Sequence, residues 1–135
     1  MSDNDMIRQA KIAKEKAANG FKLDLKAYIL QKETVLTRSF PAPGDDENHY
    51  HRAMLGFRKN GPKNNDIILN ISKWEKNGYF DVSRGFGYYT VLKAGIPRRD
   101  FKLLLEETKT CSDEYLNELL KDENVRDRLD NPSAM

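Results

Sequence analysis

Short stretches of alternating apolar and polar residues, separated by turn residues, fill the middle of the chain. Alternation of this kind is typical of strands that bury one face. Turns are expected at 60–65 and at 74–78, where the Asn77-Gly78 pair favours a tight hairpin. The predicted strands are 52–59, 66–73, 79–83 and 86–92. Strands joined by short turns run antiparallel, so the pattern predicts a small antiparallel β-sheet or an OB-like partial barrel.

The part of the chain before these strands combines a helical pattern, further strand patterns and a loop. Residues 4–19 have apolar positions at helical spacing and end at Asn19-Gly20, which predicts an N-terminal helix. Residues 21–27 alternate strictly and predict a further strand, and a second one is expected within 28–40 after a bend. Residues 41–48 contain two prolines and a glycine and predict a loop.

The C-terminal part returns to a helical pattern. Pro97 can occupy the first position of one helix, and Ser112 can cap another. The predicted fold class is therefore α+β, with one N-terminal helix and two C-terminal helices. At 135 residues a single domain is expected. Its parts are an N-terminal helix (1–20), an antiparallel β body (21–95), acidic C-terminal helices (96–130) and a frayed tail (131–135).

Charge is distributed unevenly along the chain. The net charge is only +2, but residues 1–99 hold eighteen Lys and Arg against eleven Asp and Glu, whereas 100–135 hold five against ten. Such asymmetry favours a polyanionic partner for the basic part. No apolar run is long enough for a membrane span and no signal peptide is visible, so no membrane partner is expected. Cys111 is the only cysteine, which suits a cytoplasmic protein.

The stretch around the last predicted strand combines glycines, aromatic rings and cations. Residues 86–92 alternate, with Phe86 and Tyr88 on one face and Tyr89 on the other. The sequence Arg84-Gly85-Phe86-Gly87-Tyr88 resembles the first five positions of the ribonucleoprotein octapeptide of RNA-recognition-motif domains, and cold-shock domains of the OB-fold carry a similar run. The resemblance implies that Phe86 and Tyr88 stack on bases. The structural alternative is that both rings fill the core.

We therefore expect the basic body to bind single-stranded nucleic acid without catalysis and without a cofactor. Trp74, the sole tryptophan, is either a core residue or another stacking platform. The residues expected to bind nucleic acid are Arg58, Lys63, Trp74, Arg84, Phe86, Tyr88, Lys93, Arg98 and Arg99. A protein-interaction module, such as a small inhibitor or adaptor, is the alternative, with a partner or a homodimer contacting leucine stripes of the C-terminal helices.

A third hypothesis is a small phosphodiesterase or ribonuclease. His49 or His51 would then act as acid or base, and Arg84 would stabilise phosphate charge. The His-x-His pair also belongs to the best metal-like cluster of the chain, with Asp45, Asp46 and Glu47. Because no third histidine or cysteine lies nearby and loop carboxylates are usually solvated, we expect no metal there.

Overall fold

The computed structural model describes residues 3–31 and 33–130. It contains a six-stranded antiparallel sheet with helices before and after it, the α+β class expected. In chain order the elements are α1 (Asp3–Lys16), β1 (Lys22–Leu23), α2 (Leu25–Gln31), β2 (Val35–Phe40), β3 (His49–Lys59), β4 (Asn64–Asn77), β5 (Phe80–Ser83), β6 (Tyr88–Pro97), α3 (Phe101–Thr110), α4 (Asp113–Leu119) and α5 (Glu123–Asp130). No described helix is long and apolar enough to cross a membrane.

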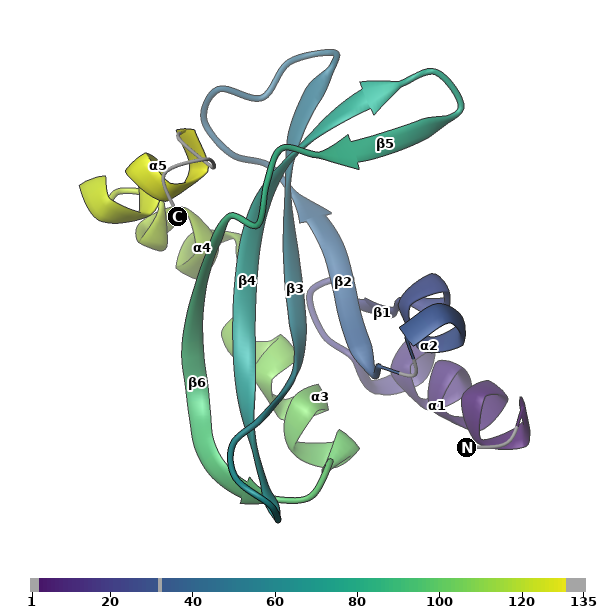
Figure 1. Cartoon of the computed structure of the whole chain (residues 1–135). Coiled ribbons are helices and arrows are strands. Elements are labelled where there is room, and N and C mark those ends of the chain that lie inside the picture. Colours follow the sequence, from purple (N-terminus) through teal and green to yellow (C-terminus); the bar gives the residue numbers. More distant parts are fainter. Residues whose placement is uncertain (1–2, 32, 131–135) are drawn as a thin grey trace.

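The sheet is open, so of the two expected arrangements the chain adopts the sheet and not the barrel. Strands β1 to β4 lie in sequence order, and every pairing is antiparallel. Strand β4 is long enough to have two partners along one edge: its end pairs with β5, as Trp74 opposite Ser83, and its earlier part pairs with β6, as Ile71 opposite Tyr88. The β4–β5 hairpin consequently projects beyond the rest of the sheet (Figure 1).

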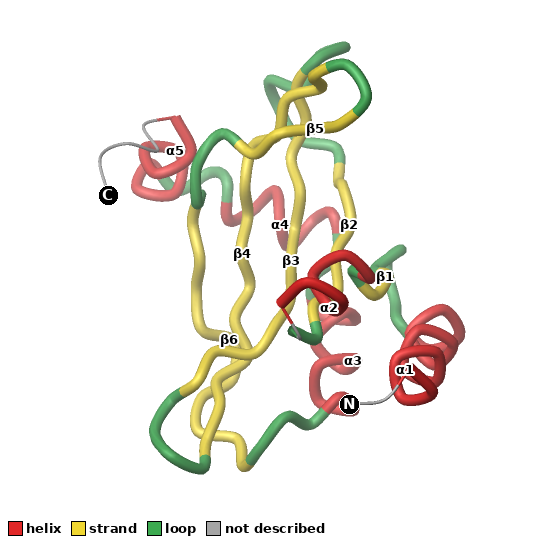
Figure 2. The backbone as a smooth tube through the Cα atoms, turned by 45° about the vertical axis from the view of Figure 1, so that its right-hand side comes forward, coloured by secondary structure: helices red, strands yellow, loops and turns green. Residues whose placement is uncertain are grey.

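The hydrophobic core lies between one face of the sheet and the C-terminal helices. Alternate residues of β3 and β4 point into it because side chains on a strand alternate between faces. Figure 2 shows α3 and α4 on one side of the sheet, with α2 on the other side beside the ends of β2 and β3. The fully buried side chains of this core include Leu36, Leu55, Ile67, Leu69, Ile71, Leu104, Leu116 and Val125.

The N-terminal region differs from the sequence prediction. The strand expected at 21–27 is reduced to the two residues of β1, and α2 begins directly after it. Asp24 explains the change, because its carboxylate accepts a hydrogen bond from the backbone N–H of Ala27 at 3.0 Å and starts the helix. The second strand begins only at Val35, as β2, and α1 ends at Lys16 instead of residue 19.

The later part of the chain differs from the sequence prediction in three places. Strand β4 continues through Trp74 to Asn77, so the turn expected at 74–78 narrows to the residues around Gly78, which has φ 65°. Pro97 ends β6 instead of opening a helix; α3 starts at Phe101, with Asp100 accepting from the N–H groups of Lys102 and Leu103. Ser112 caps α4 as predicted, but the expected second helix is divided into α4 and α5.

Candidate nucleic-acid interface

The face of the sheet opposite the core carries a groove of about 650 Å³. Its floor is largely apolar, with Val35 from β2, Met54 from β3 and Ile68 from β4. Residues at the start of α2 border one side, and the segment joining β5 to β6 borders the other. The remaining lining residues are Asp24, Ala27, Glu33, Gly56, Phe57, Asn70, Ser72, Trp74, Ser83, Gly85, Phe86 and Tyr89. The groove is thus an uncovered sheet surface with aromatic rings around it.

Trp74 contributes the first ring. Its indole N–H donates to the hydroxyl of Ser72 at 2.8 Å, which fixes the orientation of the ring on the groove side of β4. The guanidinium carbon of Arg52, from the neighbouring strand β3, lies 4.7 Å from the Trp74 ring centroid, within cation–π range. Trp74 is therefore no core residue: it lines the groove, with a cation stacked beside it.

Strand β6 contributes the second ring, but not through the tyrosine expected. Tyr88 is partly buried and packs against the hydrophobic core. Tyr89 points the other way, is 48% exposed and lines the groove. The guanidinium carbon of Arg58 lies 5.8 Å from the Tyr89 ring centroid. The expectation that Tyr88 faces the ligand is corrected by this orientation, since the register with Ile71 of β4 turns Tyr88 towards the core.

Phe86 contributes the third ring, from the loop that precedes β6. Its side chain is 76% exposed. The loop is held on both sides: the amide of Asn70 donates to the carbonyl of Phe86 at 2.7 Å, and the N–H of Arg84 donates to the carbonyl of Lys73 at 2.8 Å. Gly87 follows with φ 74°. Phe86 is therefore presented to solvent on a fixed turn.

The expected cations divide into separate groups. Arg58 belongs to the groove through Tyr89, and it also forms an ion pair of 3.1 Å with Asp66. Arg84 lies exposed on the loop of Phe86. Lys63, Arg98 and Arg99 instead line a hollow of about 760 Å³ at the far end of the β3–β4 hairpin.

One backbone hydrogen bond and one ion pair hold the group of Lys63, Arg98 and Arg99 in place. The N–H of Arg98 donates to the carbonyl of Lys63 at 3.1 Å, and Arg99 forms an ion pair of 3.4 Å with Glu33. Lys93 lies exposed on the edge strand β6 and lines neither hollow.

Sequence reasoning missed two site residues: Tyr89, which lines the groove, and Arg52, which lies beside the Trp74 ring. The alternation of 52–59 already places Arg52 and Arg58 on the face away from the core, which was the available signal. Nothing in the sequence alone decided between Tyr88 and Tyr89, because adjacent residues of a strand always face opposite sides.

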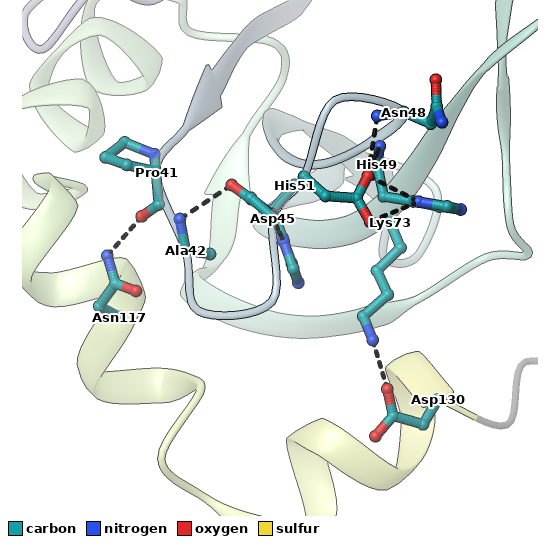
Figure 3. Close-up of polar contacts among 10 residues, drawn as sticks. Pro41, Ala42, Asp45, Asn48, His49, His51, Lys73, Asn117 and Asp130 are labelled. Atoms are coloured by element: carbon teal, nitrogen blue, oxygen red, sulfur yellow. Dashed lines mark hydrogen bonds and ion pairs between the residues drawn. The ribbon is translucent and has the colours of Figure 1, made fainter.

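The two histidines are each paired with a different carboxylate of loop 41–48 (Figure 3). His49 Nδ1 lies 2.9 Å from Asp46, and His51 Nδ1 lies 2.7 Å from Asp45. The backbone N–H of Asn48 and then the His49 ring hold the pKa of Asp46 below its usual value. Among residues 3–31 and 33–130, no group of three or more His, Cys, Asp or Glu side chains could hold a metal ion.

The hydrolase hypothesis requires a histidine and Arg84 to meet in one cleft. His51 lines a cavity with Lys73 on the core side of the sheet, and Arg84 is not among the residues of that cavity. His51 and Arg84 therefore do not meet in this cavity.

No protein-family model, curated protein or solved structure matches this chain. The class that the fold defines is α+β, with an open antiparallel sheet whose core face is covered by the C-terminal helices.

Proposed function

We propose that the uncovered face of the sheet binds single-stranded nucleic acid without catalysis. The observation that supports this most is the arrangement of Trp74, Phe86 and Tyr89 around one groove. Bases can stack on such rings regardless of sequence, each stack contributing about 1–3 kcal/mol. The apolar floor of the groove, formed by Val35, Met54 and Ile68, suits contact with base faces.

The cations near the rings suit the sugar–phosphate backbone of the same strand. Arg52 and Arg58 lie beside Trp74 and Tyr89, and Arg84 precedes Phe86. A strand stacked on Trp74 and Tyr89 therefore runs close to the guanidinium groups of Arg52 and Arg58. Arginine also stacks on exposed bases, so each can contribute in two ways.

The homodimer alternative, through leucine stripes of the C-terminal helices, receives no support. The large apolar side chains of these helices are used in the core, among them Leu104, Leu116 and Leu129. In the part of the chain that the structure describes, every exposed large hydrophobic residue lies outside α3, α4 and α5.

The direct experiment is a titration of Trp74 fluorescence with a short oligonucleotide at two salt concentrations. Trp74 is the sole tryptophan, so its emission reports on the groove. We expect saturable quenching that weakens strongly as salt rises, because cation contacts release counterions. The Phe86→Ala variant should bind more weakly, whereas Tyr79→Ala should bind normally, because Tyr79 is fully exposed at a hairpin turn outside the groove. Absence of saturable binding at low salt would remove the proposal.

A further inference from the structure

A second cavity, of about 350 Å³, lies on the helical side of the sheet. It is bounded by the loop after β2, by the strands β3 and β4, and by α4 and α5. Its apolar part is formed by Pro43, Leu120 and Leu129. Its polar part is formed by His51, Lys73, Asn117, Lys121, Arg126 and Asp130. This volume falls at the small end of ligand pockets in proteins, which suits a compact ligand with an apolar body.

His51 is the most constrained of the polar residues. Its side chain is buried, with 5% of the residue exposed. The Nδ1 atom lies 2.7 Å from a carboxylate oxygen of Asp45, and the other oxygen of Asp45 accepts from the N–H of Ala42 at 3.0 Å. Figure 3 shows this loop lying over the imidazole. The carboxylate fixes the ring, and Nε2 makes no hydrogen bond among residues 3–31 and 33–130.

The cations of the cavity are Arg126, Lys121 and Lys73. Arg126 of α5 forms no ion pair within the described chain. Lys121 is paired with Glu118 at 3.0 Å and is largely exposed. Lys73 of β4 reaches across the cavity to the carboxylate of Asp130 (Figure 3). An anion, the carboxylate of Asp130, is therefore already bound at the cationic end of the cavity.

We propose that this cavity binds a phosphate monoester, with the phosphoryl group replacing the carboxylate of Asp130 on Lys73. Lys73 of β4 and Arg126 of α5 line the cavity from different elements. A phosphoryl group carries more negative charge than a carboxylate and offers three acceptor oxygens, which suits two cations. The apolar wall of Pro43, Leu120 and Leu129 is left for the organic part of the ester. This proposal does not depend on nucleic-acid binding by the opposite face.

Phenyl phosphate is the first probe, with benzoate and inorganic phosphate as comparisons, measured by calorimetry and by the imidazole signals of His51 in NMR spectra. We expect saturable binding of phenyl phosphate that is stronger than binding of benzoate. The variants His51→Gln and Arg126→Gln should each weaken binding about tenfold. Arg126→Gln removes a charge-assisted donor, and His51→Gln removes the buried ring that lines the cavity. Asp130→Asn should strengthen binding, because the competing carboxylate is removed. Lys109→Gln, on an exposed residue of α3 away from the cavity, should bind like the wild type.

Two results would overturn the proposal: no saturable binding of phenyl phosphate, or equal binding by the wild type, His51→Gln and Arg126→Gln. Benzoate binding as tightly as phenyl phosphate would equally reject a phosphate site. The source of the ester is settled with oligonucleotides that carry or lack a 5′-phosphate, tested on the Phe86→Ala background to weaken the sheet face. A response of the His51 signals to phenyl phosphate and to the phosphorylated oligonucleotide, but not to the unphosphorylated one, would assign the cavity to strand ends. A response to phenyl phosphate alone would assign it to small esters.

Discussion

A Cβ atom built on Gly87 would lie 2.1 Å from the carbonyl oxygen of Ile71. Gly87 immediately precedes β6 and has φ 74°, a conformation that other residues rarely adopt. The close approach of its backbone to β4 is what allows Tyr88 to pair with Ile71 and the Phe86 loop to remain against the sheet edge.

The first prediction follows from this contact. Gly87→Ala should destabilise the protein by about 2–4 kcal/mol, since backbone strain is added to a clash with backbone that cannot rotate away. Gly61→Ala is the matched control, because Gly61 also has a positive φ of 87° but has open space around its Cβ position. Chemical denaturation of both variants provides the measurement. Equal losses of unfolding free energy in the two variants would show that the clash with Ile71 adds nothing to the cost of the positive φ.

The second prediction separates the two tyrosines of β6. Tyr89→Ala should weaken oligonucleotide binding by about 1–3 kcal/mol while leaving stability nearly unchanged, because Tyr89 is half exposed in the groove. Tyr88→Ala should instead lower the free energy of unfolding by about 2 kcal/mol, because Tyr88 packs on the core. Binding titration and denaturation of both variants test this. A larger binding loss in folded Tyr88→Ala than in Tyr89→Ala would contradict the assignment of the rings.

The third prediction concerns the pH dependence of stability. The N–H of Gly95, then the amide of Asn60 and the guanidinium of Arg58, hold the pKa of Asp66 below its usual value of 3.8. A folded-state pKa that is depressed stabilises the native state above the unfolded pKa, and this stabilisation is lost as pH falls below about 4 through the lower folded value. Asp66→Asn should therefore show a flatter decline of unfolding free energy between pH 5 and pH 2. An unchanged slope in the variant would argue against the role of Asp66.

The fourth prediction concerns the thiol of Cys111. Burial, and then the negative charge of Glu107, raise the pKa of Cys111 to about 12. At pH 8 only about one thiol in ten thousand is ionised, so iodoacetamide should not label the native protein within hours. Labelling should become complete in denaturant. Rapid stoichiometric labelling without denaturant would show that this region opens readily.

The fifth prediction concerns the connection between the N-terminal region and α3. The hydroxyl of Thr108, fully buried, accepts from the N–H of Ala18 at 2.8 Å. Thr108→Val keeps the shape but leaves that N–H without a partner, which should cost about 1–3 kcal/mol of stability. Thr110→Val, at an exposed position of the same helix, is the control. Equal stability of the two variants by thermal denaturation would contradict this role.

The alternation within 52–59 and 66–73 was enough to predict most of β3 and most of β4, because one face of each strand is buried. The same pattern misled at 21–27, where Asp24 starts a helix by a local hydrogen bond that overrides three alternating residues. The extension of β4 through Trp74 could not be predicted from its polar residues, since it depends on pairing with β5, a later part of the chain.

The site was predictable only in part for a related reason. Aromatic and cationic residues around 84–89 indicated a segment that does border the groove, but which tyrosine faces outward depends on the register with Ile71. The association of Arg52 with Trp74 arises between neighbouring strands and has no signature in either segment alone. Lys63 and Arg98, distant in sequence, meet because the β3–β4 hairpin and the end of β6 terminate together.

Strand β4 changes partner between Ile71 and Trp74, and the Phe86 loop leaves the sheet at that junction. Sliding of the loop along the sheet would require one of the two flanking ladders to break its hydrogen bonds. The position of Phe86 relative to the Trp74 ring on β4 is therefore fixed by these two ladders. A ligand that contacts both Phe86 and Trp74 therefore meets two rings at a fixed separation. Ligands too short to reach both rings lose part of their contact.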